Sequence, residues 1–592
     1  MKLKYPDLFY VFLAGISFCL LLFGLGEKLS FLTYSFGRIF AWTPGDIFDG
    51  ALNNWFLENN LQYFLKGGNF FNISKMFDTN LYWPEKNTLA MSDNWILITP
   101  IYAFLRTVFS PNFSFTGIIV LSLTANFMAC YRLCRHGTNN KIYRLLASFL
   151  SAFSLTVLAR LGHAQLMPAF AGVLAMDSFI EAVNLKKEEI KSSSKQKIKN
   201  FSNRISISLS DTLVGVIWLF IQIGIGFYQG TFFTIASLCL LFLVLKKRYF
   251  SKNSKLVFSK IRLKNKLSKI SLVLKLSILS FISIIDFSIY KQYLIYSSSQ
   301  QGRSWGEVSS MIPKLWSIWF NTLSTPSSVS LPAPVQTINS NSYPGPFWEH
   351  SMFPGYTFML LLFIGIIFVF KDSPINKQDN IFKFKVTTLS QVCLLMFFLT
   401  LGFGGTNPVL TPWLFIWKIV PGMSALRAVS RIGIPIVLIL APFLAWTLSE
   451  LHNRLDKKLM TVVLSILFMI YLAGNVTKGI SRFDSTDYAA KKVIFSNKIE
   501  KIIQKRNCKV FYMTSPDTKN WMYDRVYPQM MAMWASLKTG IPTSSGYSGN
   551  NPNMGWNHMM TNIQLEEWLR KKGINEEEIK TVCWIDGNEI LN

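Results

Sequence analysis

The chain has 592 residues, of which 50% are hydrophobic and 15% aromatic, while only 16% are charged. The apolar residues gather in blocks of roughly 16–22, the length at which a helix crosses hydrocarbon, so the composition excludes an ordinary soluble protein and predicts a polytopic membrane protein. The formal net charge is +28, but the basic residues lie in short loops between apolar blocks. That pattern is typical of the positive-inside rule and not of a nucleic-acid-binding protein.

The apolar blocks predict an α-helical fold with about eleven membrane-spanning helices. The first block follows Lys2 and Lys4 without a small-residue cleavage site after it, so we interpret it as a retained helix and not as a signal peptide. The predicted spans are 8–26, 113–133, 143–159, 166–183, 208–227, 230–246, 269–289, 356–370, 386–403, 432–449 and 459–474. Two apolar stretches that are too short to span predict helices in the outer interface, at 95–109 and 409–420.

The loops between the blocks alternate in charge, which predicts the side of the membrane on which each lies. The basic loops, predicted to be cytoplasmic, lie near 132–144, 186–199, 246–269, 371–385 and 454–458. The long, aromatic and nearly neutral segments, predicted to be extracytoplasmic, are 27–112, 290–355, 404–431 and the tail 475–592. We therefore expect residues 1–474 to form a multi-pass domain of the inner (plasma) membrane and residues 475–592 to form a small α/β domain on its outer face.

The tail contains two strand-like stretches, 508–513 and 581–586, and a short amphipathic helix at 563–573. Cys508 and Cys583 are the tail's only cysteines and lie in those two stretches. On an oxidising side of the membrane we expect the strands to be neighbours joined by a disulfide, with two buried thiols as the alternative. The chain has no C-x-x-C motif, so no zinc or thiol-redox site is indicated.

The first outer loop carries carboxylates in the stretch "GDIFDGALNNWFLENN" (45–60). Its apolar spacing predicts a helix from Ile47 that ends at Gly67-Gly68, with Asp46 as its N-cap. Asp49 would share a face with Asp46, and the helix N-terminus would keep both ionised. Both residues are candidates for catalysis; the alternative is that they only cap the helix and complement its dipole. Glu58 is nearly three turns further on, so we expect it to brace the loop by pairing with a basic group or an amide.

Further polar residues lie on other outward turns and are candidates for substrate binding. They are Asp93, His163, Gln165, Tyr228, Glu349, His350, Arg427 and Arg431. Asp93 has the alternative role of capping the interfacial helix, and a lone histidine is more often structural than catalytic. Arg427 and Arg431 are spaced by one helical turn and could form a fork for phosphate, or could anchor at lipid headgroups. Together these residues predict an outer cleft for a substrate with a lipid tail and a polar head.

The order of these motifs resembles the glycosyltransferase C superfamily of polytopic membrane enzymes, and bacterial glycosyltransferase-like proteins within it. The resemblance rests on "GDIFDG" (45–50) with Asn54, Trp55, Leu57 and Glu58, and on "NTLAMSDN" (87–94), "LGHAQLMP" (161–168), "PGMSALRAVSRIG" (421–433) and "GYSGNNPNMGW" (546–556). In that family an acidic residue of the first outer loop acts as a base or binds a metal. By motif position this role falls on Asp49 or Asp46.

The resemblance implies an inverting hexosyl or pentosyl transferase that moves a sugar from a polyprenyl-phosphate carrier to a cell-envelope acceptor. The acceptor could be a glycan, a lipid or a protein, and a divalent cation (Mg or Mn) could be held by Asp46 and Asp49. Arg427 and Arg431 would stabilise the departing phosphate. In the tail motif, Tyr547 and Trp556 would contact sugar; the alternative is a turn that packs the tail onto the membrane domain.

Two other functions remain open at this point. A transporter or flippase of lipid-linked glycans would need polar residues along its spans, whereas Asp211 and Asp286 fall near the ends of the predicted ones. A non-catalytic relative would only bind a glycan or anchor a partner through its tail. Substitution of Asp49 distinguishes an enzyme from both alternatives.

Overall fold

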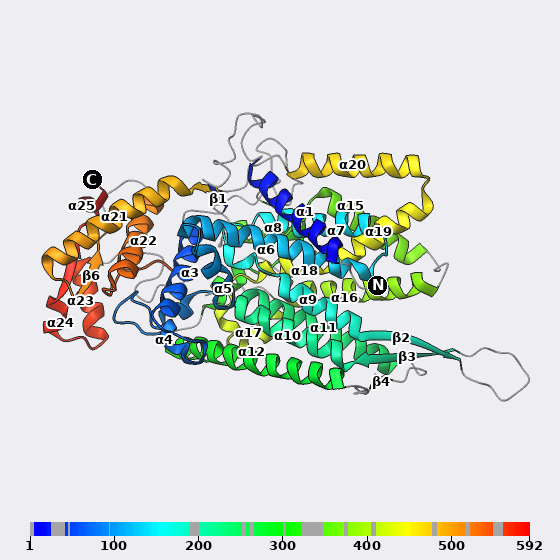
Figure 1. Ribbon diagram of the computed structural model, residues 1–592, viewed down its shortest axis with the longest axis horizontal. Helices are drawn as coiled ribbons and strands as arrows, with labels where there is room; N and C mark the ends of the chain where they lie inside the picture. The colour runs from blue at the N-terminus through cyan, green and yellow to red at the C-terminus, as the bar shows by residue number, and fades with distance from the viewer. Residues whose placement is uncertain are drawn as a thin grey trace, which may run out of the picture.

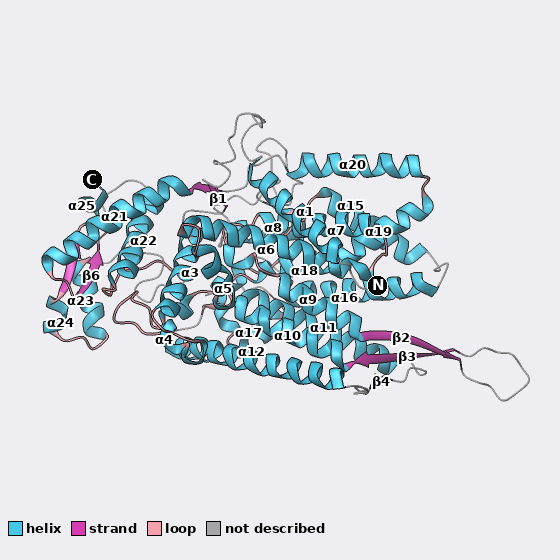
Figure 2. Cartoon of the chain, viewed as in Figure 1, coloured by secondary structure: helices cyan, strands magenta, loops and turns pink. Residues whose placement is uncertain are grey.

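The fold is described from a computed structural model. It defines residues 5–24, 42–44, 48–93, 95–189, 201–250, 256–259, 266–299, 303–321, 347–371, 377–403, 410–475, 482–514, 521–548 and 561–591. Within these residues the chain is mostly helical, and the helices form a bundle with a smaller mixed body at one end (Figures 1 and 2). At the opposite end lie the strands β2 (Val183–Glu189), β3 (Phe201–Ser208) and β4 (Leu256–Ser259).

Six of the described helical segments are long and apolar enough to cross a membrane. They are Pro111–His136, Lys141–Leu158, Phe227–Lys246, Ile270–Tyr296, Asn380–Thr400 and Val429–Arg454. Shorter apolar helices are Leu8–Cys19, Ile96–Arg106, Leu209–Ile225 and Tyr356–Lys371. A chain with this many apolar helices is a multi-pass membrane protein.

The elements of the bundle follow the apolar blocks, with several breaks. They are α1 (Tyr5–Gly24), α6 (Pro111–Leu133), η4 (Cys134–His136), α7 (Lys141–Ala152), α8 (Leu155–Leu158), α9 (Phe170–Ala182), α10 (Leu209–Ile225), α11 (Phe227–Phe250), α12 (Lys266–Ser299), α15 (Tyr356–Lys371), α16 (Lys377–Thr400), α18 (Gly433–Ile439), α19 (Ala441–Arg454) and α20 (Lys457–Asn475).

Three predicted spans differ from the structure: two are interrupted and one is longer. The span expected at 143–159 is interrupted after Ala152, and the span expected at 432–449 is divided before Pro442, which stands in the first turn of α19. Proline is tolerated there because the first turn of a helix leaves its N–H groups unpaired. The span expected at 269–289 continues to Ser299, so Asp286 lies inside α12 and not near its end.

The basic segments also depart from the expectation of loops. β2 pairs antiparallel with β3, and β3 pairs parallel with β4, so parts of the lysine-rich stretches form a small sheet. The two interfacial stretches do contain short helices, as predicted. They are η3 (Ile96–Ile98) with α5 (Thr99–Arg106), and α17 (Trp413–Ile419).

The tail contains both strands that the sequence predicts. Its elements are β5 (Arg482–Asp484), α21 (Ser485–Arg506), β6 (Val510–Met513), α22 (Trp521–Thr539), α23 (Asn562–Lys571), α24 (Glu576–Lys580), β7 (Val582–Ile585) and α25 (Gly587–Leu591). β6 and β7 pair in parallel, and a disulfide joins Cys508 to Cys583 across a Cα–Cα distance of 5.6 Å. The predicted neighbouring strands and the predicted disulfide are therefore confirmed.

The tail shares its apolar core with the first outer loop. That loop contributes α3 (Asp49–Leu65), η1 (Phe70–Asn72), α4 (Ser74–Phe77) and η2 (Thr88–Met91), and its strand β1 (Trp42–Pro44) pairs antiparallel with β5. Trp55 is 1% exposed and donates its indole N–H to the carbonyl of Met533 on α22 at 3.0 Å. The backbone N–H of Trp83, in the loop, also donates to the carbonyl of Thr543, in the tail, at 2.9 Å. Loop and tail thus fold together at one end of the bundle.

Candidate active site

The helix α3 sets the position of Asp49. It begins at Asp49 itself, with Phe48 as an N-cap that makes no side-chain hydrogen bond, and it ends before Gly67, whose φ is +86°. The expected end at Gly67 is confirmed. The helix starts two residues later than predicted. Asp46, the expected N-cap, lies outside the described residues, so its role stays a prediction. Asp49 is therefore the first-turn acid of the helix, where the dipole favours its charge.

Asp49 receives hydrogen bonds from two distant parts of the chain. His163 Nδ1 lies 2.7 Å from Asp49 Oδ2. The hydroxyl of Tyr547, from the tail, donates to Asp49 Oδ1 at 3.1 Å, and the Tyr547 ring lies 6.4 Å from that of Phe48. The side chain of Asp49 remains 25% exposed, so it is accessible from outside the protein. The described part of the tail motif thus reaches Asp49, while Trp556 lies outside the described residues.

His163 continues this chain of hydrogen bonds to Glu349. Its Nε2 lies 3.1 Å from Glu349 Oε1, so the imidazole bridges the two carboxylates of Asp49 and Glu349. An imidazole can donate from both nitrogens only when it is protonated. The geometry therefore favours a charged His163 between two ionised carboxylates.

Glu349 in turn lies between two arginines. Arg431 Nη2 donates to Glu349 Oε1 at 2.7 Å, and Arg160 Nη1 donates to the other carboxylate oxygen. Arg160 and Ser430 also donate to the backbone carbonyl of Glu349. Glu349, Arg160 and Arg431 are at most 3% exposed, so this ion pair is buried. A buried ion pair with these extra hydrogen bonds fixes its members in one geometry.

The protonation states follow from these contacts. Burial alone would raise the pKa of Glu349, but the charges of Arg431 and Arg160 hold it well below its usual range. Burial would also raise the pKa of Asp49, yet the hydrogen bond and charge of His163 lower it. Burial and Arg431 act to lower the pKa of His163, but its bonds to Asp49 and Glu349 raise it overall. Asp49 and Glu349 are ionised at neutral pH.

Arg427 and Arg431 do not form the expected fork. Arg427 lies between η8 (Met423–Ala425) and η9 (Val429–Ile432), outside any regular helix, so the one-turn spacing does not bring the two guanidinium groups into one pair. Arg427 contacts Glu307 Oε1 at 3.3 Å, whereas Arg431 contacts Glu349. Tyr228 stands between them: its hydroxyl accepts the N–H of Arg427 at 3.1 Å, and the Arg431 guanidinium lies 5.0 Å from its ring centroid.

Glu307 and Arg303 are members of this region that the sequence prediction missed. Arg303 Nη1 donates to Glu307 Oε1 at 3.1 Å, within the turn that leads into α13 (Trp305–Ser310). Their i, i+4 spacing is a sequence signal that could have found the pair, since residues four apart meet on a helical turn. Arg160 is not among the predicted site residues either, because its bond to Glu349 joins positions 189 residues apart.

Gln165 and Asp93 position the elements around the cluster. Gln165 accepts a hydrogen bond from Asn53 on α3 at 2.9 Å, which joins the His163 turn to the Asp49 helix. Asp93 accepts the N–H of Phe227 at 2.8 Å, so it caps α11 and not the interfacial helix, whose N-cap is Trp95. Burial raises the pKa of Asp93 to about 6. Through α11, Asp93 holds the neighbouring Tyr228 in place.

His350 and Glu58 occupy bracing positions. His350 is fully buried and places its ring nitrogens on the Ser317 hydroxyl at 3.1 Å and the Ser310 carbonyl at 3.0 Å. Burial lowers its pKa to about 4, so it is neutral and supports the turn that carries Glu349. Glu58 accepts from Tyr102 at 2.8 Å and from Arg106 at 3.0 Å, which confirms its predicted bracing role.

The described residues do not fit a metal site. Among them, no group of three or more His, Cys, Asp or Glu side chains is placed to hold a metal ion. Both oxygens of Asp49 already contact His163 and Tyr547, and Glu349 lies between arginines, which oppose a cation. We derive no chemical step through a metal.

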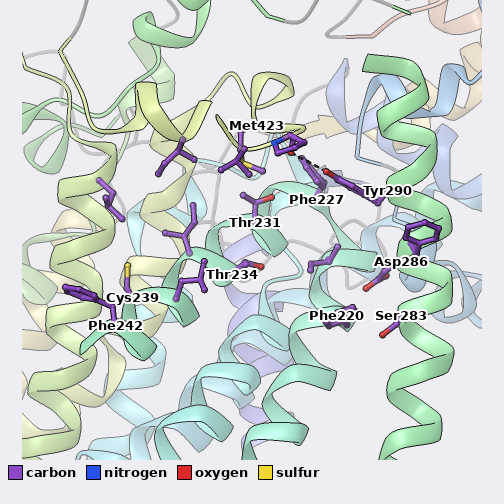
Figure 3. A pocket seen from close by; sticks show the side chains of 18 of the residues that line it. Phe220, Phe227, Thr231, Thr234, Cys239, Phe242, Ser283, Asp286, Tyr290 and Met423 are labelled. Carbon is purple, nitrogen blue, oxygen red and sulfur yellow. Dashed lines mark hydrogen bonds between the residues drawn. The ribbon is translucent and has the colours of Figure 1, made fainter. Parts of the chain in front are cut away.

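A large apolar groove lies among the bundle helices (Figure 3). Its volume is about 920 Å³. Its walls come from α10, α11, α12, α16 and the α17–η8 segment, and along α11 it runs from Phe227 to Phe242. That distance is about 22 Å at the helical rise, a large part of the hydrocarbon thickness. Phe227, at one end of the groove, immediately precedes Tyr228, the residue that contacts Arg427 and Arg431.

The family of the chain is decided by a match to residues 35–473, about three quarters of its length, described as Domain of unknown function (DUF6311). The chain belongs to this family. The DUF6311 region contains Asp49, His163, Glu349 and Arg431, whereas Tyr547 lies beyond it. No protein of curated function matches the chain in sequence.

Solved structures of an archaeal oligosaccharyltransferase are similar to this DUF6311 protein. The apo enzyme of Archaeoglobus fulgidus matches with 12% identity and a TM-score of 0.45, over 92% of this chain and 65% of that one. The AglB oligosaccharyltransferase of the same organism, in complex with an inhibitory peptide and a dolichol-phosphate, matches with 11% identity and a TM-score of 0.45, over 92% and 64%. The chain thus spans about 65% of the length of these structures.

Proposed function

We propose that this protein is a membrane glycosyltransferase of the glycosyltransferase C type. It moves a sugar from a polyprenyl-phosphate carrier to a cell-envelope acceptor on the outer face of the membrane. The observation that carries the proposal is the chain Asp49–His163–Glu349, in a protein that also has an apolar groove about 920 Å³ in volume. An accessible, ionised carboxylate beside a lipid-sized groove suits a reaction on a substrate with a polar head and an apolar tail.

Asp49 is the general base in this proposal. It is ionised, partly exposed, and oriented by bonds to both oxygens from His163 and Tyr547. The acceptor hydroxyl gives its proton to an Asp49 oxygen as its own oxygen bonds to the anomeric carbon. The bond from that carbon to the carrier phosphate breaks at the same time, and the phosphate leaves with the bonding electrons. A single displacement of this kind inverts the anomeric centre.

His163 and the arginines are placed to support the charges of that step. His163 holds the Asp49 carboxylate in one orientation, and Glu349 holds His163. Arg427 contacts Tyr228 through its backbone N–H and Arg431 lies over the Tyr228 ring, so the departing phosphate would meet positive charge beside Tyr228. Asp93 and Gln165 act as positioning residues for Tyr228 and for the His163 turn.

The proposed arrangement in the membrane has about eleven spans in residues 1–474, with the 475–592 tail as an outer α/β domain. It is supported by the position of the first loop and tail at one end of the bundle and of the basic strands β2–β4 at the other (Figure 1). Positive charge collects on the cytoplasmic side. A cysteine introduced at Glu577, an exposed residue of the tail, should react with an impermeant thiol reagent added outside the cell, and protection of that position would overturn the topology.

The function is tested by the glycans that the protein produces. Cells that lack the gene receive the wild type, the Asp49→Asn variant or the Glu576→Gln variant, and envelope glycans and lipids are compared by mass spectrometry. Glu576 is an exposed acid of the tail that pairs with Arg570, so its variant is the matched control. A glycan that is restored by the wild type and the control but not by Asp49→Asn supports the proposal. Full restoration by Asp49→Asn, at equal protein levels, overturns it and favours a transporter or a binding protein.

A further inference from the structure

Asp286 of α12 is the buried carboxyl that the proposed reaction does not use. The residue is 6% exposed, and neither of its carboxyl oxygens has a hydrogen-bond partner among the described residues. It lines the apolar groove, where its side chain points from α12 toward α10 and α11 (Figure 3). A buried polar group without a partner destabilises a protein, so a carboxyl retained at this position indicates a partner that comes from outside the chain.

The depth of Asp286 is set by its neighbour on α10. A Cβ built on Gly224 would lie 2.6 Å from Asp286 Oδ1, so the carboxyl fits against a residue that lacks a side chain. Gly224 is two residues before Gly226, where α10 ends and the chain turns into α11. Asp286 also borders a small extension of the groove that reaches Phe227 and Tyr293. It therefore lies toward the end of the groove that Phe227 lines.

The apolar surroundings define which chemical group can meet Asp286. A charged carboxylate is costly in hydrocarbon, so the side chain is neutral there and offers one O–H donor. Nearby hydroxyls have partners of their own: Thr234 donates to the Gly230 carbonyl at 2.8 Å, and Tyr290 donates to the Pro421 carbonyl at 3.3 Å. The missing partner is thus a neutral acceptor on the ligand, just below its polar head. A prenyl chain has no oxygen at that depth, whereas a glycerolipid has its ester carbonyls there.

We propose that the groove binds a glycerolipid, with an ester carbonyl of the lipid accepting a hydrogen bond from Asp286. The acyl chains follow α11 toward Phe242, and the head lies near Tyr228 and Asp49. α12 is the least buried of the six candidate spans, with 17% of its apolar window buried, so lipid can reach the groove directly from the bilayer. The assignment of this lipid as the sugar acceptor rests on the proposed glycosyl transfer; its binding in the groove does not.

The experiment measures lipid binding by the purified full-length protein in detergent, with a fluorescent diacylglycerol displaced by unlabelled lipids. The competitors are a diacylglycerol, the dialkyl ether that lacks both carbonyls, and polyprenyl phosphate. The proteins are the wild type, Asp286→Leu, Asp286→Asn and Ser283→Ala. Asparagine keeps an N–H donor at the position but removes the carboxyl group. Ser283 lines the same groove about one turn away on α12, so Ser283→Ala controls for a change of the groove that leaves Asp286 in place.

We expect the wild type to prefer the ester over the ether by about two- to tenfold, the value of one net hydrogen bond. Asp286→Leu should abolish the preference while it keeps binding, and Asp286→Asn and Ser283→Ala should retain it. Equal affinity of the wild type for ester and ether, or competitive displacement by polyprenyl phosphate at lower concentration than by diacylglycerol, would overturn the proposal. Neither result depends on sugar transfer, so a protein that shows the ester preference but makes no glycan would contradict only the proposed function.

Discussion

Two buried clusters at opposite ends of the helix bundle are built from the same side chains. In the first, Glu349 contacts Arg160, Arg431 and His163. In the second, Asp177 of α9 contacts Arg132 Nε at 2.8 Å, Arg135 Nε at 3.1 Å and His136 Nε2 at 3.0 Å. Each is a carboxylate held by two arginines and a histidine.

The two clusters differ in where their hydrogen bonds lead. Asp177 is 0% exposed, and the other nitrogen of His136 faces Lys385 at 3.3 Å, which itself contacts Glu181 at 3.2 Å. These partners come from α6–η4, α9 and α16, so the network fixes spanning helices to one another. The second nitrogen of His163 instead leads to Asp49, which is 25% exposed on a loop helix and contacts the tail. A carboxylate held by two arginines and a histidine stabilises the bundle when all of these side chains are enclosed. The same set can serve a reaction when the histidine also contacts an accessible carboxylate.

Replacement of Asp177 by asparagine tests the structural half of this comparison. It leaves Arg132 and Arg135 without their buried carboxylate, so the free energy of unfolding should fall by about 3 kcal/mol. Thermal unfolding of the purified protein in detergent measures the loss. If Asp177→Asn is as stable as the wild type but makes no glycan, the enclosed cluster is not simply structural and the contrast between the two clusters is wrong.

Replacement of Asp49 by asparagine tests the other half. The change removes a charge but hardly alters the shape, and Asp49 is partly exposed, so the free energy of unfolding should fall by less than it does for Asp177→Asn. Sugar transfer should fall by roughly a hundredfold or more, the usual effect of a general base. Rates from membranes that contain equal amounts of wild type and variant check this expectation. A variant that loses stability in proportion to activity would assign Asp49 a role in folding.

The pH dependence of stability distinguishes the clusters further. The His163 pKa is raised in the folded protein, so its contribution is complete below the unfolded value of about 6.5 and is lost as pH rises through the folded value. The Asp49 pKa is lowered, so its contribution is complete above about 3.9 and is lost as pH falls through the folded value. The stability difference between wild type and His163→Gln should therefore be largest between about pH 4 and 6.5, near 2 kcal/mol.

Unfolding of both proteins in detergent across that pH range provides the measurement. Asp78→Asn is the control, since Asp78 is an acid of the same loop that accepts the Asn87 N–H at 2.8 Å and lies outside the cluster. A difference that grows above pH 7 would show that His163 is neutral in the folded protein, against the geometry of its two carboxylate contacts.

The sequence predicts the parts of the outer cluster better than it predicts their pairings. Asp49, His163, Glu349 and Arg431 are all polar residues in the turns between apolar blocks, which is a local signal. Their contacts are not local, since His163 and Glu349 are separated by 186 residues. Backbone detail is also hard to predict: the helix starts two residues later than the spacing indicates, and an irregular segment separates Arg427 from Arg431.

The position of Asp286 along its helix is also not predictable from the sequence. The hydropathy of the block predicts a helix that ends near Asp286. The helix continues to Ser299, because Tyr293 and Tyr296 pack against residues of the first loop. By contrast, the two tail cysteines could be paired because no other cysteine competes for them there. A pairing can be predicted from the sequence when only one partner is available, as for these two cysteines. It cannot be predicted when several polar side chains could pair equally well.

The smallest expected effect belongs to Tyr547, the tail's contribution to the accessible cluster. Tyr547→Phe removes the hydrogen bond to Asp49 Oδ1 and keeps the ring next to Phe48. A bond of this kind contributes about 1 kcal/mol, so kcat/KM should fall about fivefold. Because the hydroxyl stabilises the ionised carboxylate, its loss should raise the Asp49 pKa and move the acidic limb of the kcat/KM profile to higher pH. Tyr512→Phe, on a tail residue whose ring packs 5.5 Å from Trp584, should move neither quantity. A fivefold loss without the shift of the acidic limb would assign Tyr547 to the substrate and not to Asp49, and no loss at all would show that the tail is not part of the site.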